Sequence, residues 1–171
     1  PISLFKNNNL LSKARIFLDW YFFRKGLGTS NQFETLGFLR TDRNQKYPNL
    51  QYHFLPLAIN YDGSSPHKGH GFQFHVGTMR SKSRGTVAIK NADPTSQPSI
   101  KFNYLSHPDD LKDFRNAIKI TRNILNQTAF KDYAGDEIQP SSALKTKIEL
   151  DQFIKSNVES AYHPCGTCKM G

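Results

Sequence analysis

The central part of the chain contains one strand pattern after another, with no helical pattern in between. The clearest lies in residues 70–79, where Phe72, Phe74 and Val76 alternate with polar or small residues. Such alternation is typical of a strand, because successive side chains point to opposite faces of the sheet. A parallel sheet would need helices between its strands, and no such alternation is visible. We therefore expect antiparallel strands at 33–40, 49–60, 70–79, 86–90 and 100–104, with 70–79 paired to 86–90 across a turn at 81–85.

Helical patterns lie on both sides of this central part. Residues 12–23 place large apolar side chains at helical spacing. Ser106 can cap a second helix that carries two aspartates in its first turn and runs to Leu125. Thr146 and Glu149 have the spacing of a capping box, which predicts a third helix. The fold class that we expect is α+β, with a mostly antiparallel sheet covered by helices.

The chain is strongly basic, with a formal net charge of +9 and an isoelectric point of about 9.6. Such a charge could attract nucleic acid or an anionic membrane surface. The 23 basic residues are scattered, however, and no run of five like charges occurs. We expect no nucleic-acid partner, although a non-catalytic basic β-rich module that binds an acidic partner stays open as an alternative. No stretch approaches the roughly twenty apolar residues that cross a bilayer.

The last ten residues, Tyr162 to Gly171, combine a histidine, two cysteines and two glycines. Pro-Cys-x-x-Cys is half of a zinc deaminase signature, but no histidine is followed two places later by glutamate, so we expect no metal. A redox dithiol usually opens a helix in a thioredoxin-like unit, which this context does not offer. We interpret Cys165 and Cys168 as partly buried thiols in a tight turn, in a reducing compartment.

Two histidines are candidates for chemistry. His163 lies between an aromatic residue and a proline, which restrain its backbone, and a positioned imidazole is the usual general base for an alcohol proton. A structural histidine is the more common outcome on the residues alone. In the strand at 49–60, Tyr52 and Phe54 point to one face while Gln51 and His53 point to the other. His53 could therefore line a cavity or lie exposed on the sheet.

The closing run resembles the His-Pro-x-Gly-Thr-x-x-Met-Gly motif of the glucose-methanol-choline oxidoreductases, flavoproteins that oxidise alcohols. The sequence stops inside this motif, so we expect it to be part of a longer protein. The resemblance covers essentially the whole chain. Further segments that are similar to the choline-oxidising members of the family are 30–34, 49–56, 70–73, 79–81, 83–85 and 102–104.

The resemblance implies roles for five residues. His163 matches the active-site histidine that lies by the flavin and handles the substrate hydroxyl proton. His53 matches a second histidine that hydrogen-bonds the alkoxide. Phe33 and Tyr162 match aromatic rings around the substrate's quaternary ammonium, and Glu34 could add negative charge there. Such a cage suits choline, because a trimethylammonium has no N–H to donate and is held by ring quadrupoles and a nearby carboxylate.

The resemblance also implies an architecture and a reaction. Residues 1–149 would form the substrate-binding domain, and 150–171 would begin the return into the FAD-binding domain. FAD would be bound mainly by parts outside this chain, so these residues alone should be inactive. The implied reaction is oxidation of choline to betaine aldehyde, and onward to glycine betaine, by hydride transfer to flavin. A related FAD-dependent dehydrogenase acting on another alcohol is the alternative.

The family likeness further implies where the electrons go. They would pass to a membrane-linked acceptor rather than to oxygen. We therefore expect peripheral membrane association. The expected location is the cytoplasm or the cytoplasmic side of a bacterial inner membrane, or the mitochondrial inner membrane in a eukaryote.

Overall fold

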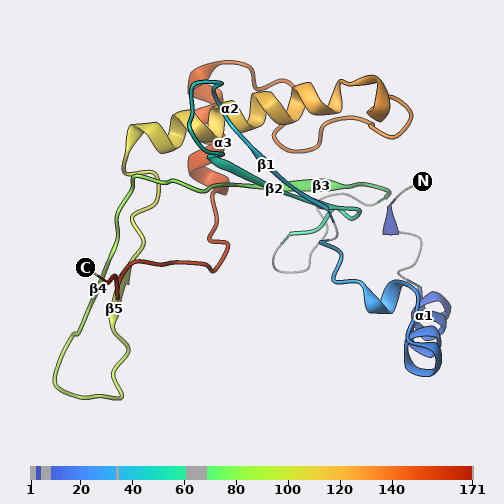
Figure 1. The fold of residues 1–171 in the computed structure, drawn as a ribbon, viewed down its shortest axis with the longest axis horizontal. Coiled ribbons are helices and arrows are strands. Elements are labelled where there is room, and N and C mark those ends of the chain that lie inside the picture. The colour runs from blue at the N-terminus through green and yellow to red at the C-terminus, as the bar shows by residue number, and fades with distance from the viewer. Residues whose placement is uncertain (1–2, 5–8, 34, 61–68, 171) are drawn as a thin grey trace.

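Figure 1 shows a computed structural model of the chain, which describes residues 3–4, 9–33, 35–60 and 69–170. Three antiparallel strands form one sheet in the order β1 (Thr35–Leu39), β2 (Leu50–Leu55) and β3 (Gln73–Thr78). A second, two-stranded sheet pairs β4 (Thr86–Ala88) with β5 (Ser99–Lys101). The predicted antiparallel α+β fold is confirmed, but its five strands are divided between two sheets.

The predicted pairing of residues 70–79 with 86–90 is wrong. β3 pairs with β2 instead, and β4 pairs with β5. The physical reason is that residues 81–83 after β3 are hydrogen-bonded to Asp110, which holds the chain away from the edge of the first sheet. β2 is also shorter than predicted, because it ends at Leu55 before Pro56, which has no N–H for a ladder.

Helix α1 (Leu10–Phe23) confirms the first predicted helix. The side chain of Asn9 caps its first turn by accepting a hydrogen bond from the Ser12 amide, at 2.8 Å. The helix ends at Arg24, which takes the left-handed conformation with φ 52°. No residue of α1 is buried, and in Figure 1 the helix lies well away from the sheet, followed by the short 3-10 helix η2 (Leu27–Thr29).

Helix α2 (Pro108–Leu125) lies over one face of the three-stranded sheet, and η3 (Thr128–Phe130) follows it (Figure 1). The cap is not Ser106, as the sequence suggested, but His107, whose Nδ1 accepts a hydrogen bond from the Asp109 amide. Pro108 explains the difference: it fits the first helical position, so the residue just before it becomes the cap.

The core lies between α2 and the sheet. Its buried residues are Leu50, Tyr52 and Ala117. The Tyr52 hydroxyl donates to the Ala117 carbonyl at 3.1 Å and accepts from the Thr121 hydroxyl at 3.1 Å. These bonds satisfy the one polar atom that the strand inserts into the core.

Helix α3 (Lys147–Asn157) begins with the predicted capping box, in which Thr146 and Glu149 exchange hydrogen bonds. It buries Leu150 and Ile154, and an ion pair between Arg115 and Asp151 joins it to α2. The predicted domain boundary at 149/150 therefore falls inside this helix. Among the described residues, no helix is long and apolar enough to cross a membrane.

Candidate functional site

The face of the three-stranded sheet opposite α2 carries two pairs of glutamine and histidine. Gln51 and His53 lie on β2, with 2.7 Å between their Nε2 atoms, and Gln73 and His75 lie on β3, with 2.5 Å between theirs. His53 and His75 are register partners, so both rings project from the same face of the sheet. The alternation predicted for both strands is confirmed, since Tyr52 packs against α2 on the other face.

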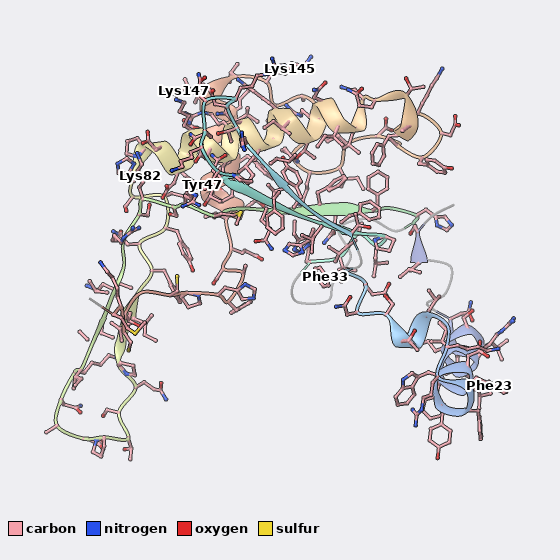
Figure 2. All side chains as sticks on the ribbon, viewed as in Figure 1. Phe23, Phe33, Tyr47, Lys82, Lys145 and Lys147 are labelled. Atoms are coloured by element: carbon pink, nitrogen blue, oxygen red, sulfur yellow. The ribbon has the colours of Figure 1, made fainter. Side chains whose placement is uncertain are left out.

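Phe33 packs against both histidines. Its ring meets that of His53 edge-on at 5.8 Å between centroids, and that of His75 edge-on at 6.2 Å. Two local turns place it: Ser30 Oγ accepts from the Gln32 amide, and Asn31 Oδ1 accepts from the Phe33 amide. Figure 2 shows Phe33 on the side of the sheet that faces away from α2.

An open hollow of about 3270 Å³ is lined by residues from the sheet, from α2 and from the segment after α3. Phe33, His53, His75 and His163 are all among its lining residues. The lining residues therefore include both histidines that the sequence singled out and one of the two aromatic rings. Tyr162 is 78% exposed and is not among the described residues that line it. The fifth predicted residue, Glu34, lies outside the described residues.

The segment that carries His163 is exposed from residue 161 to residue 170. It is anchored at Ser160, whose hydroxyl oxygen accepts hydrogen bonds from the Tyr104 hydroxyl and the Tyr162 amide, each at 3.0 Å. Tyr162 itself has a positive φ of 58°. This left-handed residue turns the chain immediately before His163, so the imidazole sits on a defined bend.

Both cysteines of this segment are free and exposed. Our interpretation of Cys165 and Cys168 as partly buried thiols is therefore wrong. Residues 161–170 are all exposed in the described part of the chain, so this turn is not buried in a core. Within the described part of the chain, no group of three histidine, cysteine or acidic side chains could hold a metal ion.

The surroundings of His75 affect its pKa. Burial lowers the pKa of His75, as does the nearby imidazole of His53, while the carboxylate of Glu159 opposes both effects. The Nδ1 atom of His53 is buried and has no hydrogen-bond partner among the described residues. Buried polar atoms are normally hydrogen-bonded, and a bound hydroxyl group could supply the partner of this Nδ1 atom. The site thus offers an aromatic ring, two imidazoles and an unused polar atom.

Asp110, at the start of α2, is one of the residues that line the hollow. Its carboxylate accepts hydrogen bonds from the hydroxyls of Ser81 and Ser83 and from the amides of Lys82 and Ser83. Burial alone would raise the pKa of Asp110, but these bonds lower it from 3.8 to about 2. The segment after β3 is therefore tied to α2, and both contribute lining residues.

Sequence reasoning missed Gln51, Gln73, His75 and Asp110. A signal was present for the first three, because Gln51-Tyr52-His53 and Gln73-Phe74-His75 repeat the same triplet of glutamine, aromatic residue and histidine. On two strands, that triplet puts both polar residues on one face. For Asp110 the sequence pattern indicated only a place in the first turn of a helix, and the partners that it binds depend on the tertiary fold.

Comparisons with known proteins bear on this site. A protein-family model described as GMC oxidoreductase matches residues 81–171. The chain is 54% identical over all 171 residues to an oxygen-dependent choline dehydrogenase from Brucella anthropi, and 51% identical to one from Rhizobium rhizogenes. In both comparisons the whole chain is covered, but only 31% of the relative. The chain thus spans about a third of the length of these relatives.

Solved structures agree on the fold. A formate oxidase superposes on 94% of this chain, and on 32% of its own length, with a TM-score of 0.82 at 21% sequence identity. A pyridoxine 4-oxidase covers 82% of this chain and 28% of its own length, with a TM-score of 0.70 at 25% identity. A formate oxidase from Aspergillus oryzae, described in terms of its FAD modification, gives a TM-score of 0.80 at 21% identity, covering 94% of this chain and 33% of its own.

Proposed function

Because this chain belongs to the GMC oxidoreductase family, we propose that it is part of an FAD-dependent enzyme that oxidises choline to betaine aldehyde, and onward to glycine betaine. The observation that carries the proposal is the 54% identity along the entire chain to oxygen-dependent choline dehydrogenases. The site supports it, since Phe33, His53 and His163 line one hollow. We further propose that residues 1–149 form the substrate-binding domain and that 150–171 lead back into the FAD-binding domain.

The proposed chemistry divides between the two histidines. His163 accepts the proton of the substrate hydroxyl as a general base. His53 hydrogen-bonds the same oxygen and stabilises negative charge on it, for which its unpartnered Nδ1 is available. FAD, when bound, supplies the acceptor for the hydride that leaves the hydroxyl-bearing carbon. The exposed segment 161–170 fits contact with a cofactor held by the rest of the protein, because its side chains are not engaged in a core of their own.

The substrate's cationic end is proposed to lie against aromatic rings. Phe33 already packs edge-on against His53, so a trimethylammonium near its face would leave the hydroxyl within reach of the imidazoles. Tyr162 is proposed to supply a second ring and Glu34 negative charge. A neighbouring carboxylate that the structure does describe is Glu159, which lines the same hollow.

The test is the substitution His163→Ala in the complete protein that contains these residues. Losing a positioned general base should lower kcat by about 100- to 10,000-fold while FAD stays bound. His107→Asn is the matched control, because asparagine preserves the cap of α2 and His107 is not proposed to act in the reaction. Near-normal turnover of choline by the His163 variant would refute the assignment. Faster turnover of an aliphatic alcohol than of choline by the unchanged protein would support the related alcohol dehydrogenase instead.

For the electron acceptor we propose a membrane-linked carrier, reached by peripheral association with a membrane. Exposed aromatic residues on α1 include Phe22 and Phe23, and Arg24 and Lys25 follow them. Figure 2 labels Phe23 on this helix. Such a combination suits the interface of an anionic bilayer. The proposed location is the cytoplasm or the cytoplasmic side of a bacterial inner membrane, or the mitochondrial inner membrane in a eukaryote.

The names of the relatives point instead to oxygen, so the experiment compares the two acceptors. Choline oxidation by the purified complete protein is measured with oxygen alone and with added membranes. Turnover that requires the membranes supports the carrier, whereas equal turnover with oxygen alone contradicts it. Replacing Phe22 and Phe23 with serine should reduce sedimentation with anionic phospholipid vesicles.

A further inference from the structure

In one of the two glutamine–histidine pairs of the sheet, a backbone contact fixes the orientation of the glutamine side chain. This orientation determines which ring nitrogen of His75 carries the proton. The Oε1 atom of Gln73 accepts a hydrogen bond from the backbone amide of Ile59 at 2.9 Å. The side-chain amide of Gln73 is therefore oriented, and its Nε2 end must face the Nε2 atom of His75, 2.5 Å away. An amide nitrogen can only donate a hydrogen bond.

It follows that His75 accepts this bond with the lone pair of its Nε2 atom. A neutral imidazole has one such lone pair, and its proton must then be on Nδ1. A charged imidazolium has none, so protonating His75 would break the contact and leave two donors facing each other. Burial and the neighbouring imidazole of His53 lower the pKa of His75 in the same direction.

His75 is also placed to affect His53. The two residues are register partners on β2 and β3, and the ring of Phe33 packs edge-on against both. Positive charge on one imidazole disfavours positive charge on the other. The described charged groups that act on His75 are His53 from β2 and Glu159 from the segment after α3. Gln73 contributes an uncharged donor from β3 itself.

We propose that His75 is a positioning residue that stays neutral so that His53, directly across the sheet, can carry positive charge when negative charge develops on the substrate oxygen. The relay from the Ile59 amide through Gln73 enforces this neutrality. A neutral His75 also adds no repulsion next to a substrate that is itself a cation. The proposal rests on the proposed function, in which His53 contacts the hydroxyl of choline.

The decisive variant is Gln73→Glu in the complete, FAD-loaded protein. One carboxylate oxygen can still accept from the Ile59 amide, while the other now favours a charged His75. The acid limb of the pH profile of kcat/KM for choline should move to higher pH by about one unit, which is a tenfold loss on that limb. Activity at alkaline pH, where His75 is neutral in either protein, should be nearly unchanged. Gln73→Met, which removes the donor to His75 but adds no charge, should move the acid limb in the same direction by a smaller amount.

A second comparison tests whether the shift of the acid limb comes from His75 or from a general disturbance of the fold. In a His75→Asn background the residue across from His53 cannot titrate, so adding Gln73→Glu should no longer shift the acid limb. An unshifted limb in Gln73→Glu alone, or the same shift with and without His75, would overturn the proposal.

An NMR titration of histidine-labelled complete protein gives a readout that does not depend on turnover. His75 should carry its proton on Nδ1 and should titrate below the ordinary histidine pKa of about 6.5. Its pKa should rise in Gln73→Glu. A wild-type His75 that titrates at or above the ordinary value would refute the neutral relay. If His75 titrates as expected but choline is not oxidised, the proposed function fails and the neutral relay stands.

Discussion

Asp110 accepts hydrogen bonds from both the backbone amide and the side-chain hydroxyl of Ser83, 27 residues earlier in the chain. Together with the bonds from Ser81 and Lys82, these hold the loop after β3 against the first turn of α2. Asp110 is only 3% exposed, so its charge depends on these donors for its stabilisation.

Replacing Asp110 with asparagine should therefore destabilise the protein. The amide group would turn a donor toward hydroxyls and amides that need an acceptor, and we expect the free energy of unfolding near neutral pH to fall by about 1–3 kcal/mol. Urea unfolding followed by circular dichroism measures it. Asp109→Asn is the control, because the contacts of Asp109 with Lys82 and His107 are exposed ion pairs. Equal midpoints for Asp110→Asn and the unchanged protein would contradict the role.

The Asp110 carboxylate also predicts how the free energy of unfolding changes at acidic pH. The pKa of Asp110 is lowered on folding, from 3.8 to about 2, so its contribution to stability is complete above about pH 4 and is lost as the pH falls through 2. The difference in unfolding free energy between the unchanged protein and Asp110→Asn should shrink over that window. A difference that stays constant from about pH 5 to pH 2 would show that the charge is not what matters.

Removing the buried hydroxyl of Tyr52 should have a smaller effect. In Tyr52→Phe the ring keeps its packing, and Thr121 can still donate to the Ala117 carbonyl, at 2.8 Å. We expect a loss of about 1 kcal/mol, the usual value of one hydrogen bond. Tyr47→Phe is a matched control on an exposed tyrosine and should change stability little. Thermal unfolding of the two variants measures both losses of stability. A loss in Tyr47→Phe as large as that in Tyr52→Phe would contradict the role of the buried hydroxyl.

Arg122 ties the loop after η3 to α2. Its guanidinium makes three hydrogen bonds to the Glu137 carboxylate and donates to the carbonyls of Ser141 and Leu144. Lysine keeps the charge but cannot reproduce this fork. Arg122→Lys should therefore speed hydrogen exchange in residues 137–144, while Arg15→Lys, at an exposed ion pair on α1, should not. Unchanged exchange in the loop would mean that other contacts hold it.

Phe33 should distinguish a cation from a neutral substrate of the same shape. If its ring holds the trimethylammonium, Phe33→Leu should raise KM for choline by about 5- to 30-fold, since a desolvated cation–π contact contributes about 1–2 kcal/mol. The isostere in which a tert-butyl group replaces the trimethylammonium should be affected much less. Steady-state kinetics with both substrates test this. An equal rise in KM for the two would mean that Phe33 contributes only shape.

Much of the fold follows from local patterns in the sequence, such as helix caps and the alternation of side chains along a strand. The capping box of Thr146 and Glu149 and the alternation around His53 and His75 were predictable, because each depends on residues a few positions apart. The cap of α2 was misassigned by one residue, since Ser106 and His107 can both accept a hydrogen bond and only the backbone decides between them. The motif at residues 162–171 gave the family, but it did not indicate that both cysteines are exposed.

Local sequence patterns were therefore enough to predict most of the helices and strands, their polar and apolar faces, and the histidines proposed for chemistry. Which strands pair could be seen only in the folded protein, where Asp110 binds residues 81–83 from 27 or more positions away. The tertiary fold also places His75 opposite His53. It orients the side chain of Gln73 through the backbone amide of Ile59, 14 residues earlier in the chain. Contacts between residues so far apart in the chain are set by the competition among all possible pairings, which no local pattern encodes.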